Sequence, residues 1–444
     1  MAELGYEQLR IYLDNQQYQE LQTVLNQLHP VDIVQLLNDL SADDQKLVFE
    51  LLDIEVASDV LPHLPDQILE YILADIHTNK LVKIIDEMET DEAADIISEM
   101  KEEDSEELLA KIDQQDSQNI KQLLNYDEDS AGGLMQTEII AVQKSAKRDQ
   151  LIEDIRKNYD EVEKLNYVYV VDDENRLIGN LDIAKLLLAK PERKAEDIME
   201  PVVISAPVDM DQEHVANLFR KYDIYTLPVV DSENHLLGRI TVDDIIDVID
   251  EEASEDAYKM VGLESEDRVF TSPLSSVKKR LPWLTLNLFT ALLVSSVVGI
   301  FEQTIARLSF LAVLMPIVAG LGGNSGTQTL TVITRGIALG ELTIRNTYRA
   351  IFKEITVGLI NGIIVGSFAM LIAYLLRGDI ILGIVLGSAM VCNMFIAGLV
   401  GSLIPVIMKM LKIDPALASS VIITMLTDIG GFASFLGLAT LFVK

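Results

Sequence analysis

The sequence predicts a multidomain protein, in which an all-α, helical-repeat-like domain and an α+β domain precede an α-helical membrane domain with five transmembrane helices. Three observations indicate this organisation: a sharp change of charge along the chain, an internal repeat near its middle, and a series of long apolar segments after the repeat. Residues 1–270 contain 23 Lys or Arg against 64 Asp or Glu, whereas residues 271–444 contain 12 against 6. The acidic part is long enough for about two soluble domains, and the basic part is too apolar for a soluble core.

The composition disfavours several classes of function. A strongly acidic surface repels nucleic acids and anionic lipids, and it attracts cations. The single cysteine, Cys392, lies in an apolar segment and the five histidines all precede these segments, so a path for soft metal ions through thiolate or imidazole is disfavoured. We find no nucleophile, base and orienter arrangement and no phosphate loop, so we expect no enzyme. The opening residues MAELGYEQLR lack the features of a signal peptide, which predicts a cytosolic N-terminus.

The first predicted domain covers residues 1–128, where short apolar faces alternate with acidic turns, as in LLNDLSADDQKLVFELL and METDEAADIISEM. Apolar residues three and four positions apart, with Asp, Ser, Thr or Pro at each start, predict consecutive short amphipathic helices with N-caps. Neighbouring units are similar without a strict period, which is typical of a helical superhelix. Most of these acidic residues would only keep the helical surface soluble.

An internal repeat defines the second predicted domain, residues 129–249, with copies at about 129–192 and 193–249. The segment VVDDENRLIG at 170–179 returns as VVDSENHLLG at 229–238. Each copy opens with an apolar turn that ends in Met135 or Met199, and each continues from a β-rich run into a helix. This order resembles a tandem pair of CBS modules, which implies an α+β sensor domain that pairs with a second chain.

Carboxylates accumulate at the end of the second copy and in the connector that follows, residues 250–280, which we expect to contain an acidic helix. Several acids recur there at helical spacings of three and four: Asp243, Asp244, Asp247, Asp250 and Glu251. Like charges on one helical face repel one another, and a divalent cation would relieve the repulsion. The alternative is an ordinary solvated acidic helix.

The membrane domain, residues 281–444, contains five apolar segments, at about 282–303, 309–334, 352–376, 380–409 and 416–443. If the first segment begins inside, nine Lys or Arg residues lie on the inner side and three on the outer side. Because cytoplasmic loops carry the excess of basic residues, we expect a multi-pass protein of the cell membrane with a cytoplasmic N-terminal half and an external C-terminus.

One acid, Asp428, stands alone deep in the last apolar segment. A charged carboxylate in the middle of a bilayer costs roughly 2.5–3.5 kcal/mol, and such groups usually face a partner or a water-filled path. The alternative to a path is a basic partner, but the apolar cores of the later segments contain no Lys, Arg or His. Asp428 therefore indicates a route for cations.

The second apolar segment differs from the others because it combines Pro316 with the run GLGGNSGTQ. Polar side chains and broken backbone occur at membrane depth only where they are buried or face water, so we expect this segment to line the pore. In the third segment Gly358, Gly362 and Gly366 recur every four residues, which predicts close helix packing instead.

The GGNSGTQ and VITRGIALGEL segments and the terminal run DPALASSVIITMLTDIGGF, together with the domain order, resemble the MgtE family of magnesium channels. The resemblance implies a homodimer in the lipid bilayer with one pore on its two-fold axis, and Mg²⁺ as both the transported and the regulatory ion. It also implies that Asp428 is the ion-selecting acid, with Asn324 and Asp414 near the same route. Where relatives carry a Thr pair or an Asn before the pore acid, this chain has Ser420, Ile423 and Thr424.

By the same resemblance, acidic residues of the cytosolic part would sense Mg²⁺ and close the channel: Asp59, Asp91, Asp95, Asp211, Glu213, Asp223, Asp244, Asp247, Glu252, Glu255 and Asp256. CBS pairs often resemble adenine-nucleotide sites, so ATP is a further candidate ligand. Magnesium keeps several of its waters, which suits one or two carboxylates better than an all-protein cage, and acidic rings favour cations in a channel. Two alternatives stay open: a carrier for other divalent cations such as Co²⁺ or Mn²⁺, and a membrane-anchored nucleotide sensor without transport.

Overall fold

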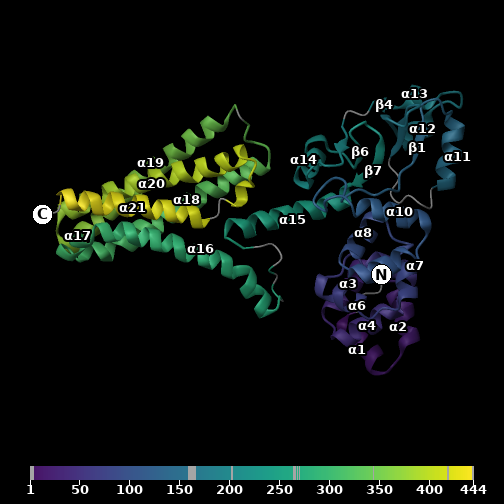
Figure 1. Cartoon of the computed structure of the whole chain (residues 1–444), viewed down its shortest axis with the longest axis horizontal. Coiled ribbons are helices and arrows are strands. Elements are labelled where there is room, and N and C mark those ends of the chain that lie inside the picture. The colour runs from purple at the N-terminus through teal and green to yellow at the C-terminus, as the bar shows by residue number, and fades with distance from the viewer. Residues whose placement is uncertain are drawn as a thin grey trace. The chain divides into compact units, whose positions relative to one another are not determined.

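The structure is a computed structural model that describes residues 5–158, 167–201, 204–263, 267, 269, 271–343, 345–417 and 420–442. The chain forms two compact units, Met1–Val248 and Ile249–Lys444. The first contains short helices followed by two small sheets, and the second contains long helices (Figure 1). The predicted fold class, with a helical domain, an α+β repeat domain and five membrane-length helices, is confirmed.

Short helices build the N-terminal domain: α1 (Tyr6–Asp14), α2 (Tyr18–Leu25), α3 (Pro30–Asn38), α4 (Ala42–Leu51), α5 (Ile54–Val60), α6 (Asp66–Leu73), α7 (Thr78–Ile85), α8 (Thr90–Ser98), α9 (Glu102–Leu109) and α10 (Gln114–Leu123). Many of them pack on the helix two places later in the chain, as α3 does on α5 and α8 on α10. This pattern of near-neighbour packing is that of a superhelix. Each helix is too short to be stable alone, so its apolar face must be covered by these neighbours.

The predicted N-caps are correct for only some of these helices. Ser41 accepts a hydrogen bond from the Asp44 N–H at the start of α4, and Asp113 accepts one from the Gln115 N–H at the start of α10. In contrast, α7 and α9 follow His77 and Lys101, whose side chains make no capping bond. Tertiary packing, rather than capping, therefore defines several of the boundaries.

The α+β domain has two sheets. The first has the order β1 (Ala141–Gln143), β2 (Tyr167–Val171), β3 (Leu177–Asp182), β4 (Glu200–Pro201), and the second has the order β5 (Ala206–Pro207), β6 (Thr226–Val230), β7 (Leu236–Thr241). In each sheet the first pair is parallel and the second is antiparallel. The helices of this domain are α11 (Arg148–Asn158), α12 (Ile183–Leu188), α13 (Ala195–Ile198), α14 (Gln212–Tyr222) and α15 (Val242–Met260).

The internal repeat is also a repeat of local geometry. In the two β-hairpins, Asp172 and Asp231 accept backbone N–H bonds from the two turns, and Asn175 and Asn234 both have positive φ, 60° and 68°. Asp and Asn are suited to these roles because they bond their own backbone and tolerate the left-handed region. The predicted repeat is therefore confirmed at the level of single turns.

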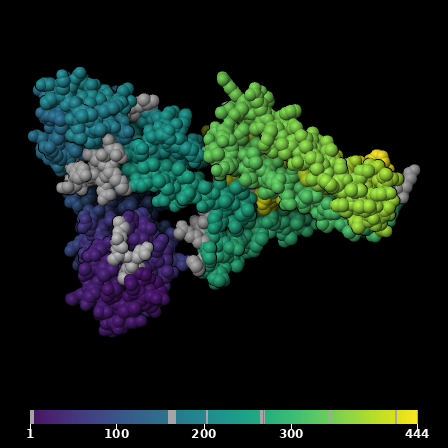
Figure 2. Space-filling model, turned by 180° about the vertical axis from the view of Figure 1, so that it is seen from behind, coloured from purple at the N-terminus to yellow at the C-terminus, as the bar shows by residue number. Residues whose placement is uncertain are grey.

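The second unit contains the membrane-length helices α16 (Pro273–Ile300), α18 (Phe310–Ala338), α19 (Thr347–Arg377), α20 (Ile380–Met410) and α21 (Ser420–Phe442), with the short α17 (Glu302–Arg307) after α16. Helix α20 packs against α18, α19 and α21, whereas no residue of α16 is buried in the described chain. Large apolar side chains of α16 and α19 stay exposed, and the light-green part of the second unit in Figure 2 includes the α19 surface. Such surfaces fit a bilayer and not water.

Glycines allow α19 and α20 to approach closely, as the four-residue spacing predicts. A Cβ at Gly358 would lie 2.5 Å from the Met394 carbonyl oxygen, and one at Gly366 would lie 2.7 Å from the Gly387 carbonyl oxygen. Contacts this short leave no room for a side chain. The packing role of these glycines is confirmed.

The structure gives the helix boundaries around the polar motif and the connector. Helix α18 runs without a break through the GGNSGTQ motif, because its glycines lie against neighbouring helices instead of breaking the backbone. Among the described residues of the connector expected at 250–280 there is no separate helix: the first part continues the acidic helix α15, which begins at Val242, and the last part opens α16 at Pro273. Pro282 lies inside α16.

Candidate ion path and cation-binding residues

Asp428 lies on α21, where its side chain is half buried. Its Oδ1 atom is buried and has no hydrogen-bond partner among the described residues. One turn earlier on α21, Thr424 lies beside α18, since a Cβ at Gly323 would be 3.6 Å from its side chain. Ser420, the first residue of α21, is half buried. The candidate pore residues of α21 thus share a helix that packs directly on the polar motif of α18.

The polar motif of α18 has a packed side and an open side. Gly322, Gly323 and Gly326 are buried, and a Cβ at Gly326 would lie 2.5 Å from Ile423 of α21. Asn324 is exposed. The expected pore-lining role therefore suits Asn324, whereas the glycines serve the contact between helices.

Two polar residues of the membrane unit were missed by the sequence reasoning. Asn393, in the middle of α20, is fully buried and donates from Nδ2 to the Val318 carbonyl oxygen at 2.8 Å. Glu354 of α19 is only 4% exposed and contacts Lys353 and the Thr329 hydroxyl, which is 3.4 Å from its Oε2. Asn393 could have been found as a polar residue in an apolar run, whereas Glu354 follows Lys353 at the very start of the third segment, where charges are common. Asp428 is thus not the lone buried acid of this unit.

Asp414 lies in the loop between α20 and α21 and not inside a helix. Its Oδ1 accepts the Ala416 N–H at 2.8 Å, and its Oδ2 accepts from Lys259 Nζ at 2.8 Å. Lys259 also pairs with Glu255 on the same helix, α15. Burial, and then the nearby Asp414 carboxylate, raise the pKa of Asp256. The sequence-predicted acids Glu255, Asp256 and Asp414 are therefore brought together around one lysine.

A second group of predicted acids meets inside the first unit, where α8 lies near the start of α15. Asp91, in the first turn of α8, is only 6% exposed. Burial, together with the charges of Asp244 and Glu89, raises the pKa of the Asp91 carboxyl well above its usual range. Asp244 accepts a hydrogen bond from the Thr241 hydroxyl, and Glu89 accepts one from Gln136 Nε2 at 2.9 Å. Acidic oxygens from two domains therefore converge here under mutual repulsion.

Other predicted sensor residues are more exposed. Asp95 lies on α8 one turn after Asp91, Asp59 lies on α5, and Asp247 lies one turn after Asp244 on α15; all three are exposed. Glu252, further along α15, is half exposed. Each is on a helix, but the structure does not gather the three residues of the first unit, Asp59, Asp95 and Asp247, into one group.

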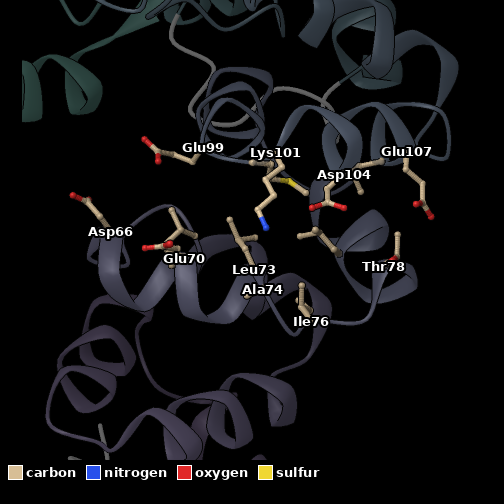
Figure 3. Close-up of a pocket in the computed structure, with 14 residues that line it drawn as sticks. Asp66, Glu70, Leu73, Ala74, Ile76, Thr78, Glu99, Lys101, Asp104 and Glu107 are labelled. Carbon is tan, nitrogen blue, oxygen red and sulfur yellow. The ribbon is translucent and has the colours of Figure 1, made fainter.

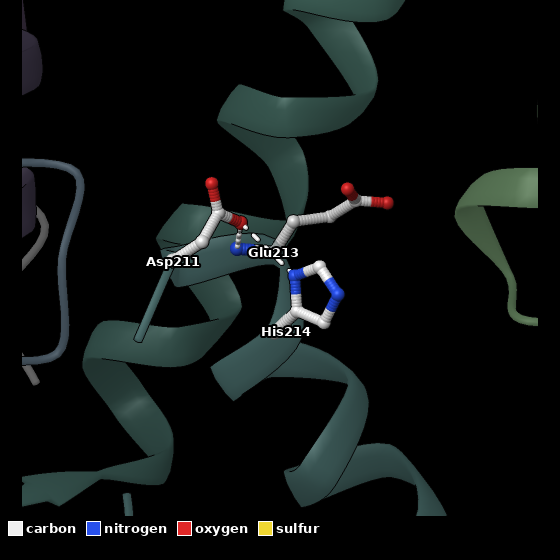
Figure 4. A group of neighbouring side chains, drawn as sticks. All are labelled: Asp211, Glu213 and His214. Atoms are coloured by element: carbon white, nitrogen blue, oxygen red, sulfur yellow. Dashed lines mark hydrogen bonds and ion pairs between the residues drawn. The ribbon is translucent and has the colours of Figure 1, made fainter. Parts of the chain in front are cut away.

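At the start of helix α14, two predicted cation ligands, Asp211 and Glu213, lie beside His214, which was not predicted. One side-chain ligand atom each of Asp211, Glu213 and His214 lies within 4.8 Å of the others at the start of this helix (Figure 4). Asp211 Oδ1 accepts the Glu213 N–H at 3.0 Å and lies 3.4 Å from His214 Nδ1. Asp223 instead caps the other end of α14, in the left-handed conformation. The structure therefore joins Asp211 to Glu213 but separates both from Asp223.

A hollow in the first unit is lined by other residues. It measures about 690 Å³ and is lined by residues of α6, α7 and α9, with Lys101 pointing into it between carboxylates (Figure 3). A lysine inside this hollow already compensates part of its negative charge. None of the predicted site residues lines it.

Five membrane-length helices, the half-buried carboxylate of Asp428 on the last of them, and an acidic helical and CBS-like part together define a multi-pass membrane protein of the cation-transporter class. Family models for the MgtE divalent cation transporter, the MgtE intracellular N domain and the CBS domain match residues 315–438, 28–129, and 131–192 with 195–251. The magnesium transporter MgtE of Thermus thermophilus is 34% identical over 96% of this chain and 95% of its own length. That of Enterococcus faecalis is 38% identical over 73% of this chain and 72% of its own. The chain belongs to the MgtE family.

Solved structures agree with this assignment for the first unit. The cytosolic domain of the Mg²⁺ channel MgtE, crystallised in complex with ATP, is 33% identical, covers 55% of this chain and 100% of that chain, and superposes with a TM-score of 0.53. The soluble part of a magnesium transporter is 31% identical, covers 56% and 98%, and has a TM-score of 0.51.

Proposed function

We propose that this protein is a magnesium-selective channel of the cell membrane and that it works as a homodimer with the N-terminal half in the cytoplasm. The observation that carries the proposal is Asp428, a carboxylate within a membrane-length helix with a buried oxygen that has no partner among the described residues. A charged carboxylate inside the membrane is energetically costly, and such groups usually mark a path for ions or water. In a two-fold dimer, two copies of Asp428 would face each other across such a path.

Magnesium is the ion that fits this chemistry best. It binds oxygen ligands and keeps several waters, so a pair of carboxylates with the exposed Asn324 amide nearby would hold the hydrated ion. The relatives that cover most of this chain are named magnesium transporters. A carrier for Co²⁺ or Mn²⁺ with the same acids is the second candidate.

We further propose that cytosolic Mg²⁺ closes the channel. The acids around Asp91 and Asp244 suit such an ion, because buried carboxylates that repel one another gain most from a divalent cation between them. Glu255, Asp256 and Asp414 would form a second such group on the membrane unit. With little Mg²⁺ the acids would push the domains apart, and bound ions would draw them together and close the pore. ATP, present in the crystal structure of a relative's cytosolic domain, is a candidate ligand of the CBS pair.

The test is Mg²⁺ flux through purified protein in liposomes, with Mg²⁺ varied on each side. We expect wild-type flux that follows the electrochemical gradient without a coupled ion, and no flux from Asp428→Ala or Asp428→Asn with unchanged dimerisation. Wild-type rates from Asp428→Ala would rule out the pore assignment. Flux that requires a second gradient would favour the carrier, and nucleotide binding without any flux would favour the sensor.

A further inference from the structure

One fully buried polar side chain of the membrane helices is an amide. Asn393 of α20 has 0% exposure, and its Nδ2 donates to the Val318 carbonyl oxygen of α18 at 2.8 Å. Its Oδ1 has no partner among the described residues. A buried amide in an apolar surrounding is costly unless it is hydrogen bonded, so its presence at the centre of a membrane helix calls for a reason.

The position of Asn393 suggests this reason, since its side chain lies between two other helices. A Cβ at Gly322 of α18 would lie 2.1 Å from Asn393 Nδ2, and a Cβ at Gly431 of α21 would lie 2.6 Å from the same atom. Only glycine at both positions leaves room for the amide. Asn393 therefore contacts α18 and α21 simultaneously from α20.

Both contacts lie next to candidate pore residues. Gly322 is two residues before Asn324 on α18, and Gly431 is three residues after Asp428 on α21, which places it about one turn away. A shift or rotation of either helix at these glycines would move Asn324 or Asp428 with it. The amide bond adds a direction to the contact that apolar packing lacks, because the donor must point at the Val318 carbonyl.

We propose that Asn393 is a positioning residue for the ion path, which sets the depth and rotation of Asp428 and Asn324 by fixing α18 and α21 against α20. This inference rests on the proposed function. Asn393 itself need not touch the ion. It acts as an outer support of a metal ligand, a role in which substitution typically costs about 10–100-fold in affinity or activity.

The first test replaces Asn393 by leucine, which has the same branching and number of side-chain heavy atoms but cannot donate. In liposomes, we expect the half-saturating Mg²⁺ concentration of Asn393→Leu to rise, or its maximal flux to fall, by about tenfold or more. Melting temperature and elution volume report on folding, since a merely structural role would lower the folded fraction without changing the half-saturation of the remainder. Thr334→Val is the matched control, because Thr334 of α18 is also buried with a hydroxyl that has no partner among the described residues. We expect it to conduct as the wild type does.

A second test remains informative if Asn393→Leu fails to fold. Gly322→Ala should reduce flux in the wild-type background, because the new methyl group would collide with the Asn393 amide. In the Asn393→Ala background the methyl group has space, so the double variant should conduct better than the product of the two single effects. Gly437→Ala, on α21 with nothing within 4 Å of its Cβ, is the control.

The outcomes separate this inference from the proposed function. If the wild type conducts and Asn393→Leu has the same maximal flux and the same half-saturating Mg²⁺ concentration, the positioning role is overturned. Independent, multiplicative effects of Gly322→Ala and Asn393→Ala would overturn it as well. Wild-type protein that carries no Mg²⁺ would contradict the proposed function itself, and the positioning role with it.

Discussion

Lys259 Nζ of α15 lies 2.8 Å from Asp414 Oδ2 in the loop between α20 and α21. Lys259 also pairs with Glu255, so one ammonium group joins two carboxylates. Burial alone would lower the pKa of Lys259, but its hydrogen bonds to Asp414 and Glu255 raise it, and the side chain stays charged. Within the second unit, a cation supplied by the chain itself thus holds the end of α15 on the membrane helices.

We predict that Lys259→Met loosens this contact in Mg²⁺-free buffer, because Glu255, Asp256 and Asp414 are then left as neighbouring carboxylates. Cleavage of the end of α15 by a protease should become several-fold faster, a modest effect, since partly exposed ion pairs contribute up to about 1 kcal/mol. Millimolar Mg²⁺ should restore protection by replacing the ammonium group. Lys409→Met, on the last turn of α20, controls for the loss of one charge. Equal cleavage of Lys259→Met and wild type without Mg²⁺ would show that the ion pair does not hold the helix.

Asp91 gives a prediction for pH. The carboxyl has a raised pKa in the folded protein, so between its unfolded pKa, near 4, and the raised value the folded state holds a proton that the unfolded state has lost. Stability contributed by this group is therefore complete at low pH and is lost as the pH rises through that window. In EDTA, the melting temperature of wild type should fall with rising pH, and that of Asp91→Asn should fall less.

The effect of Asp91→Asn on the melting temperature should depend on Mg²⁺. At neutral pH in EDTA, Asp91→Asn should melt a few degrees higher than wild type, at roughly 2–4 °C per kcal/mol for a unit of this size. Added Mg²⁺ should stabilise wild type more than the variant, because the variant lacks one ligand. Asp95→Asn, an exposed acid one turn further along α8, is the comparison. A variant that is less stable than wild type in EDTA would show that Asp91 is not held under repulsion.

Particular residues show why part of this architecture was predictable and part was not. The hairpin repeat could be read from the sequence because Asp172, Asn175 and their counterparts act within a few residues of their own backbone. The importance of Asp428 could be predicted because a charge within a membrane-spanning apolar segment is costly whatever its neighbours are. The contacts of the Asn393 side chain could not be predicted from the sequence. They depend on Gly322 and Gly431, which are 71 and 38 residues away along the chain and meet Asn393 only in the folded structure.

The α18 glycines show how one sequence pattern can serve two structures. Glycine and polar residues together favour a broken helix at membrane depth, and they equally favour a continuous helix with a closely packed side. Only the neighbouring helices decide between the two. Here Ile423 and Asn393 lie against the glycines, so the helix continues.

The α19–α20 contact predicts a large effect of a small substitution. Gly366→Ala would place a methyl group 2.7 Å from the Gly387 carbonyl oxygen, which is backbone and cannot move aside. Forcing a group into a packed contact typically costs about 1–3 kcal/mol, so we expect lower thermal stability in detergent and a smaller folded fraction. Gly437→Ala should change neither, because its Cβ meets nothing within 4 Å. Unchanged melting of Gly366→Ala would mean that the two helices are not held at this distance.

The proposed closure by cytosolic Mg²⁺ gives the last prediction, which concerns the acids of α15. A ligand shifts an equilibrium only through its different affinities for the two states, and a change from about 1% to 99% closed needs roughly 10⁴-fold in total. Several weak sites can share this factor and make the response steep. We therefore expect that neutralising five acids together leaves the channel conducting at Mg²⁺ concentrations that silence the wild type: Asp244, Asp247, Glu252, Glu255 and Asp256.

This variant retains Lys259 and Asp414, so the contact between α15 and the membrane helices keeps one ion pair without metal. Protection of α15 from protease should consequently persist in part in EDTA but should no longer increase when Mg²⁺ is added. Neutralising five exposed carboxylates of α9, Glu102, Glu103, Asp104, Glu106 and Glu107, changes the net charge by the same amount and should leave closure intact. If the α15 variant still closes at the wild-type Mg²⁺ concentration, these acids form only a solvated face, and the sensor must lie with Asp91 and the start of α14.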